Sequence, residues 1–150
     1  MADAHRAAAE AGWGSGASPL VTGRGTDQAA LEAELARFED TEAALVFPSG
    51  YTANAGTIAA LVSQRDAVFS DAHNHASIID GCRLSGARPF VYPHGDWQAP
   101  AAMLENATGF RRRLIVTDSL FSMDGDFAPL VPIAALAEQH HAMLMVDEAH

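Results

Sequence analysis

The chain has 150 residues, of which 49% are hydrophobic and 19% are charged, and its formal net charge is −10. This composition predicts a globular domain with its own core and argues against an intrinsically disordered chain. The acidic balance argues against a nucleic-acid partner. The sequence has neither a run of about 20 apolar residues nor a signal-peptide pattern, so we expect a cytoplasmic protein without a membrane partner.

Two features of residue usage limit the possible chemistry. Cys82 is the single cysteine, which excludes an internal disulfide and favours a reducing compartment. All nine basic residues are arginine, so the chain contains no lysine. The one basic run, residues 111–113, is interpreted as a solvated turn before a strand. A mechanism that requires a lysine side chain cannot be completed by these 150 residues alone.

The first quarter of the chain predicts a loop and one helix. Residues 12–25 are rich in glycine and serine, as in a loop. Either Thr26 or Asp27 is expected to cap the helix that follows. This helix carries apolar side chains at helical spacing, namely Leu31, Leu35 and Phe38.

The next segment predicts a strand followed by a helix. Residues 43–47 read as a short buried strand, which Pro48, Ser49 and Gly50 break. The helix is expected to run to about residue 62. Its apolar side is formed by Ile58, Leu61 and Val62.

Strands and helices alternate through the rest of the chain. Further strands are expected over residues 67–70, 90–92, 114–117 and 142–146. Helices are expected over residues 77–84 and 99–106 and from Pro129 onward, the last with Ile133, Leu136 and Ala137 facing inward.

Five strands interleaved with helices predict an α/β fold with a mostly parallel, doubly wound sheet. Ligands of such sheets bind beyond the carboxyl ends of the strands. Polar residues of interest follow the predicted strands at that edge: Ser49, residues 71–75, Asp118, Ser122, Asp147 and His150. We therefore expect a functional site there.

Residues 47–54 form a strand, a turn of small residues and a helix start. Free backbone N–H groups beside a helix dipole can bind phosphate at such a place. The segment is not a Walker A loop, because it lacks the Gly-Lys-Ser/Thr element. Taken alone, an ordinary capped helix explains the pattern better.

Three further segments each allow two interpretations. His73 and His75 beside Asp71 could be metal ligands, but no second ligand set completes a zinc site. The favoured interpretation is that an imidazole stacks its flat face on an aromatic ring. The acidic residues within 118–126 suit a turn at a site better than a calcium loop. The segment 147–150 could begin a helicase box, which the absence of lysine excludes. We therefore expect no metal.

Together, and in this order, these segments resemble the α-oxoamine synthases, which are fold-type I enzymes dependent on pyridoxal 5'-phosphate (PLP). The resemblance extends over residues 14–150 and rests on residues 14–18, 31–32, 49–54, 74–81, 121–126, 128–130 and 147–150. It implies that residues 1–150 form part of the PLP-binding large domain, without the C-terminal small domain.

The resemblance also implies a role for each site residue. Backbone groups of Ser49, Gly50 and Tyr51 would hold part of the cofactor phosphate. His75 would stack on the pyridine ring, and Asp147 would keep the ring nitrogen protonated, so that the ring accepts electrons from a carbanion. Ser122 and His150 would hydrogen-bond the phenolic oxygen, and Asp118 would support the site.

Enzymes of this family condense a small amino acid with an acyl thioester and release carbon dioxide. The segment 121–130 looks most like members that use alanine and a pimeloyl thioester of CoA or acyl carrier protein in biotin synthesis. The next most similar member is glycine C-acetyltransferase. The whole protein is expected to be a homodimer. The lysine that anchors PLP in the family normally lies a few dozen residues after 147–150. The chain is therefore expected to be inactive alone, and a lysine-less partner subunit is the alternative.

Overall fold

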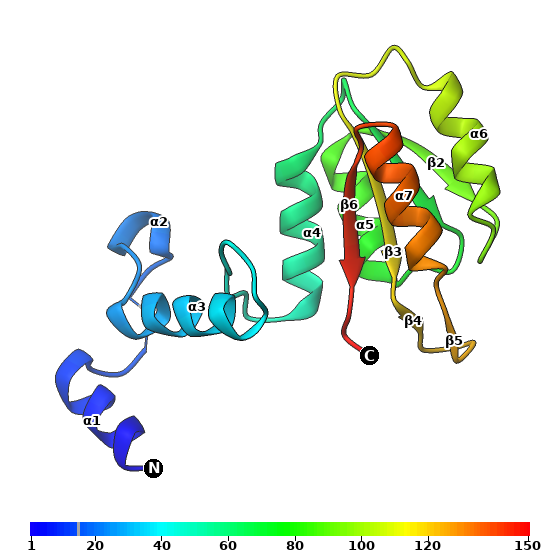
Figure 1. Cartoon of the computed structure of the whole chain (residues 1–150). Coiled ribbons are helices and arrows are strands. Elements are labelled where there is room, and N and C mark those ends of the chain that lie inside the picture. The colour runs from blue at the N-terminus through cyan, green and yellow to red at the C-terminus, as the bar shows by residue number, and fades with distance from the viewer. Residues whose placement is uncertain (15) are drawn as a thin grey trace. The chain divides into compact units, whose positions relative to one another are not determined.

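The computed structural model describes residues 1–14 and 16–150, so Ser15 of the segment 14–18 lies outside the described residues. The chain divides into two compact units, Met1–Val46 and Phe47–His150. Figure 1 labels the helices and strands of both units.

The first unit consists of helices α1 (Ala2–Ala11), α2 (Pro19–Thr22) and α3 (Thr26–Phe38). The buried residue of α3 is Glu32, a carboxylate rather than an apolar side chain. Its Oε2 lies 2.7 Å from Arg24 Nη1, and its Oε1 accepts a 3.1 Å hydrogen bond from the Val46 backbone N–H. Glu32 therefore fixes the loop before the helix and the segment after it.

Several predictions for this region are wrong. The segment 12–25 contains the short helix α2, and Gly25 rather than Thr26 or Asp27 occupies the N-cap of α3, without a side-chain cap. Residues 43–47 form no strand and pair with none among the described residues, and Leu45 is 71% exposed. The apolar pattern predicts a buried strand, but the backbone N–H of Val46 donates to the Glu32 side chain and not to a neighbouring strand.

The second unit contains a four-stranded sheet in which all pairs are parallel, with strand order β2-β1-β3-β6. Its strands are β1 (Ala67–Asp71), β2 (Arg88–Tyr92), β3 (Arg113–Asp118) and β6 (Met143–Asp147). A separate antiparallel hairpin pairs β4 (Leu120–Phe121) with β5 (Asp126–Phe127). The expected α/β class with a mostly parallel sheet is confirmed, although the sheet lacks the strand predicted at 43–47.

Helices cover both faces of this sheet, which makes it doubly wound (Figure 1). They are α4 (Gly50–Leu61), α5 (Ala76–Ser85), α6 (Gln98–Asn106) and α7 (Leu130–Gln139). Alternating strand residues divide the core in two. Val68, Leu114 and Val116 pack with side chains of α4 and α5, including Ile58 and Ile78. Phe69, Tyr92 and Ile115 pack on the other face with side chains of α6 and α7, including Leu104 and Ile133.

The basic run at 111–113 has a structural role beyond that of a solvated turn. Arg111 lies beside Asp66, which is fully buried, with Nε···Oδ1 and Nη2···Oδ2 distances of 3.0 and 2.7 Å. The backbone N–H groups of Ser63 and Arg112 also donate to this carboxylate. Hydrogen bonds from the Arg111 guanidinium hold the pKa of Asp66 far below its usual range, although burial acts in the opposite direction.

None of the described helices combines the length and the apolar composition that crossing a membrane requires.

Candidate active site at the carboxyl ends of the strands

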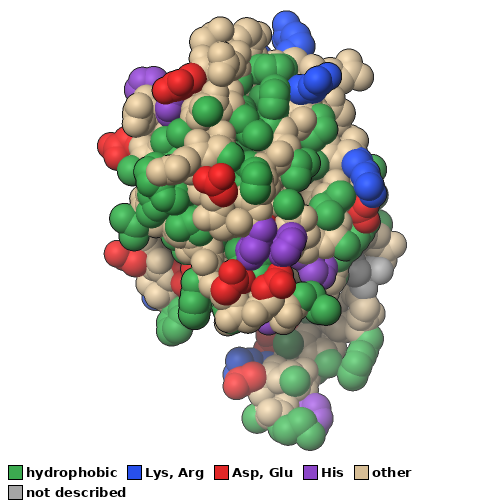
Figure 2. Space-filling model, turned by 90° about the vertical axis from the view of Figure 1, so that its right-hand side faces the viewer, with side chains coloured by type: hydrophobic (Ala, Val, Ile, Leu, Met, Phe, Trp, Pro, Cys, Tyr) green, Lys and Arg blue, Asp and Glu red, His purple; other side chains and the backbone are tan. Residues whose placement is uncertain are grey.

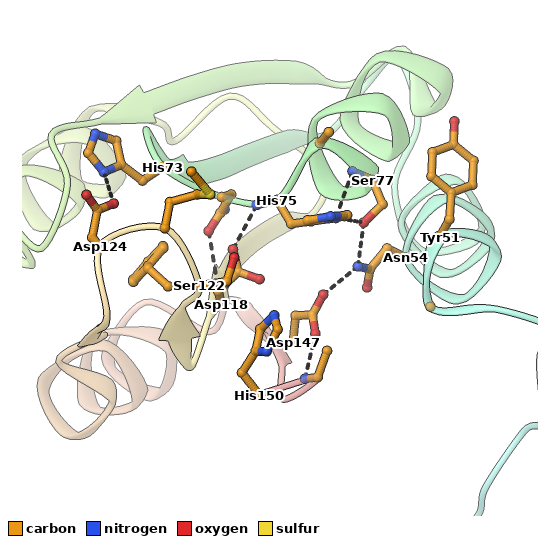
Figure 3. A pocket seen from close by; sticks show the side chains of 16 residues that line it. Tyr51, Asn54, His73, His75, Ser77, Asp118, Ser122, Asp124, Asp147 and His150 are labelled. Carbon is orange, nitrogen blue, oxygen red and sulfur yellow. Dashed lines mark hydrogen bonds and ion pairs between the residues drawn. The ribbon is translucent and has the colours of Figure 1, made fainter.

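A cavity of about 280 Å³ lies at the carboxyl ends of the parallel strands, close to the lower limit of the roughly 300–1,000 Å³ typical of small-molecule sites. It brings together most residues that the sequence marked, and Figure 3 shows them converging from α4, α5, the β4–β5 hairpin and the end of the chain. From that set its lining includes Gly50, Tyr51, His75, Asp118, Ser122, Asp147 and His150.

Asp147 ends strand β6, and its carboxylate is held on both oxygens (Figure 3). Its Oδ2 accepts a 2.7 Å hydrogen bond from Asn54 Nδ2, and its Oδ1 accepts a 2.9 Å bond from the Ala149 backbone N–H. Both donors are neutral, and no arginine is among the described residues that line the cavity, so the carboxylate has no arginine partner there. It can pair with a cationic group of a ligand.

His75 occupies the N-cap of α5 and turns a face of its ring toward the cavity (Figure 3). Its Nδ1 accepts a 3.2 Å hydrogen bond from the Ser77 backbone N–H and lies 2.7 Å from Ser77 Oγ. Ser77 Oγ in turn accepts a 2.9 Å bond from Asn54 Nδ2. A continuous chain of hydrogen bonds therefore runs from His75 through Ser77 and Asn54 to Asp147.

Asp118 ends strand β3, next to Asp147 in the register of the sheet. Its Oδ2 accepts a 2.8 Å hydrogen bond from the His75 backbone N–H, and its own N–H donates to Asn74 Oδ1. Burial raises the pKa of Asp118, and the nearby charge of Asp147 acts in the same direction. Asp118 thus orients the loop that carries His75.

The first turn of α4 lies at another side of the cavity, where Gly50 and Tyr51 belong to the lining. The first N–H groups of a helix have no acceptor within that helix and face outward with the positive dipole end. Ser49 is not part of the lining. Its hydroxyl forms a capping box with Thr52, which fixes the start of the helix. Tyr51 Oη donates to Asp80 Oδ2 over 3.1 Å, and this hydrogen bond raises the pKa of Tyr51.

Ser122 and His150 reach the cavity from the β4–β5 hairpin and from the residues after β6. The hairpin was not predicted, because its strands are only two residues long. Within the turn it forms, Gly125 has φ 73°, a conformation that favours glycine.

Sequence reasoning missed the roles of Asn54 and Ser77, although both stand in segments that carry the resemblance. Both are buried, at 6% and 1% exposure, and each bonds to a group on the cavity wall. The signal in the sequence is an asparagine at the fifth position of an apolar helix, because such a side chain becomes buried and then needs hydrogen-bond partners.

The resemblance implies PLP as the cofactor, and we expect Asn54→Ala to weaken its binding about tenfold, because a lost buried hydrogen bond costs roughly 1–3 kcal/mol and Asp147 would lose a fixed orientation. Equilibrium titration with PLP measures the change. The matched control is Asn106→Ala, which removes an exposed side chain on α6 that bonds only to its own helix. Equal affinities for the two variants would show that Asn54 does not position Asp147.

Comparison with known proteins decides the family. The sequence profile described as aminotransferase class I and II matches residues 3–150. The chain belongs to this family.

Curated relatives place the chain near one group of α-oxoamine synthases. It is 59% identical over 149 residues to 8-amino-7-oxononanoate synthase of Geobacter sulfurreducens, which covers 97% of this chain and 38% of that protein. It is 58% identical over 144 residues to the enzyme of the same name from Trichlorobacter lovleyi, covering 96% of this chain and 37% of the relative. The chain thus spans less than two fifths of the length of these relatives.

Solved structures agree with this placement. A lysine-to-alanine variant of serine palmitoyltransferase from S. paucimobilis, with a bound PLP–myriocin aldimine, superposes with TM-score 0.90 at 36% identity, over 99% of this chain and 37% of that one. The structure of 8-amino-7-oxononanoate synthase from Francisella tularensis superposes with TM-score 0.73 at 30% identity. That comparison covers 97% of this chain and 39% of the other. The resemblance to α-oxoamine synthases and the fold-type I architecture are therefore confirmed, and PLP is present in the serine palmitoyltransferase structure.

Proposed function

We propose that this chain forms the cofactor-binding part of an 8-amino-7-oxononanoate synthase, a PLP-dependent C-acyltransferase of biotin synthesis. The whole enzyme would condense L-alanine with a pimeloyl thioester, carried by CoA or acyl carrier protein, and release carbon dioxide. The observation that carries the proposal is the convergence of Asp147, His75 and the first turn of α4 on one cavity. The identities of 58–59% to enzymes of that name support the choice of substrates.

The residues of the cavity fit PLP by their chemistry. The carboxylate of Asp147 suits a protonated pyridine nitrogen, and the ring face of His75 suits a planar aromatic ring. The N–H groups of the first turn of α4 suit a phosphate. When bound, PLP supplies an electron-accepting ring that stabilises negative charge at the α-carbon of the amino acid.

Each side chain then has a distinct task. Asp147 holds the proton on the pyridine nitrogen, and Asn54 keeps the carboxylate turned toward it. His75 fixes the plane of the ring, and Asp118 holds the backbone of His75. Ser122 and His150 are assigned as the donors to the phenolic oxygen, and Ser49 acts by capping α4 rather than by touching the phosphate with its hydroxyl.

The substrate assignment is tested on the whole protein that carries these residues, loaded with PLP. We expect turnover of L-alanine with a pimeloyl thioester to exceed turnover of glycine with acetyl-CoA, with product and carbon dioxide measured together. Faster turnover of glycine with acetyl-CoA would make the protein a glycine C-acetyltransferase. No turnover by a folded, PLP-loaded protein would favour a lysine-less partner subunit.

A homodimer is proposed for the whole enzyme. The first unit exposes large apolar side chains, and contiguous apolar surface often marks an interface. They include Trp13, Leu20, Val21, Phe38 and Leu45, exposed by 71–95%. We expect the 150-residue chain to elute as a dimer or larger species in size-exclusion chromatography, or else to unfold at low denaturant. A monomeric elution with a cooperative melt at high stability would contradict this.

A further inference from the structure

A cluster of histidine and aspartate side chains lies at the rim of the cavity. His73 follows β1, His94 follows β2, and Asp124 and Asp126 belong to the β4–β5 hairpin. The rings of His73 and His94 stack with centroids 4.2 Å apart and planes 11° apart. Figure 2 shows histidine side chains adjoining acidic side chains on one face of the molecule. Residues far apart in the sequence thus converge on one small area.

Each ring of this cluster faces a carboxylate of the hairpin. His73 Nδ1 lies 2.8 Å from Asp124 Oδ2, and His94 Nε2 lies 3.0 Å from Asp126 Oδ2. An imidazole nitrogen at this distance from a carboxylate oxygen requires a hydrogen or a cation between them. The two contacts lie side by side and bring two ring nitrogens and two carboxylate oxygens into one small area.

Asp71 holds the ring of His94 from the opposite side. Its side chain is only 2% exposed, and its Oδ1 lies 2.9 Å from His94 Nδ1. The backbone N–H groups of His73 and Gly95 also donate to Asp71. A carboxylate that binds one ring N–H directs the other nitrogen toward a ligand, as in the outer shell of many metal sites. Asp71 therefore prepares Nε2 of His94 for coordination.

We propose that His73, His94 and Asp124, with Asp126 beside them, form a binding site for one divalent transition-metal ion of the Zn²⁺ type. Ligand atoms of the first three residues lie within 4.8 Å of one another. Donors around one tetrahedral Zn²⁺ with bonds of about 2.0–2.1 Å lie roughly 3.4 Å apart, so the ligand atoms need to close by up to about 1.4 Å. One ring also has to turn out of the stack, because the lone pair of an imidazole nitrogen lies in the plane of its ring. His73 and Asp124 are half exposed, at 48% and 43%, which leaves room for this movement and a path for the ion.

The proposed ion would affect the neighbouring cavity. His73 and Asp124 belong to its lining, and Ser122 lies in the same hairpin as Asp124. An ion bound by both would tie the hairpin to the end of β1 and limit the movement of Ser122. Metal binding itself does not depend on the proposed function.

The test is titration of the metal-stripped protein with Zn²⁺, without PLP, by isothermal calorimetry and by competition with a chromogenic chelator. We expect one Zn²⁺ per chain and binding weakened more than about tenfold in His73→Ala and in Asp124→Asn. The control is His5→Ala, which removes an exposed imidazole outside the cluster and should leave the affinity unchanged. Circular dichroism establishes that each variant is folded.

Substitution of Zn²⁺ by Co²⁺ supplies a second readout. Visible bands of tetrahedral Co²⁺ in the wild-type protein that disappear in His73→Ala would support the site. Equal Zn²⁺ affinity in wild type, His73→Ala and Asp124→Asn would overturn the proposal, since ions would then bind elsewhere. Absence of any stoichiometric Zn²⁺ binding by the folded wild type would overturn it as well, and neither result would bear on PLP.

Discussion

Asp147→Asn is expected to lower the activity of the whole PLP-loaded protein about 10²–10³-fold, the usual effect of removing one preorganised electrostatic group. The amide has nearly the same shape and can still accept the hydrogen bond from Asn54, but it carries no charge to hold a proton on the pyridine nitrogen. Steady-state kinetics with saturating PLP measure the loss. The reduction should lie mainly in kcat, because the proton matters during chemistry more than in substrate binding.

Glu148→Gln is the matched control for this experiment. It makes the same change from carboxylate to amide one residue away, at an exposed side chain outside the cavity lining. Its activity should remain within about twofold of wild type, since surface substitutions typically change free energies by less than 0.5 kcal/mol. If Asp147→Asn kept the same activity as Glu148→Gln, the role assigned to Asp147 would be wrong.

Asp66→Asn is expected to lower the free energy of unfolding by about 2–3 kcal/mol. Removing one partner of a buried ion pair costs about 3–5 kcal/mol. The cost is expected to be smaller here, because the Arg111 side chain is 47% exposed and solvent screens its charge. The amide would also turn a donor toward the N–H groups that now bond to the carboxylate. Urea unfolding measures the change, and Glu105→Gln on the exposed side of α6 serves as control. Equal stability of the two variants would contradict the prediction.

The effect of Asp66 has a defined pH dependence. Its pKa is lowered in the folded protein, whereas an unfolded Asp titrates near pH 3.9. The carboxylate therefore stabilises the fold fully above the unfolded pKa, and this contribution is lost as pH falls toward the folded pKa, because the unfolded state takes up the proton first. The difference in stability between wild type and Asp66→Asn should be constant above about pH 5 and should shrink below pH 4. A difference independent of pH would contradict this.

Apolar periodicity was sufficient to predict the sheet but not the first unit. Strands β1 and β3 consist of residues buried on both faces, so their apolar runs identify them clearly. Residues 43–47 have a similar run, yet Leu45 is exposed. Local pattern does not reveal whether a partner strand is available, and here the Val46 N–H bonds to Glu32 instead.

The sequence marked Asp147 and His75 as site residues, and both line the cavity, while their roles stay predictions. Contacts between distant segments were not predictable. Asn54 reaches Asp147 across 93 positions, and the ring of His73 stacks on His94, which lies 21 positions further along the chain. The packing of α4 on the sheet and the pairing of β1 with β2 create these contacts, and the pattern of a single segment does not show which other segment it will meet.

The cavity is proposed to bind PLP without a covalent link, because these 150 residues contain no lysine. Absorbance titration of the folded 150-residue chain with PLP, followed by borohydride and mass spectrometry, tests it most directly. We predict saturable binding at one site that dialysis reverses and that borohydride does not fix, because the chain has no lysine. A stoichiometric pyridoxyl adduct on a single residue, or no saturable binding at all, would contradict the account.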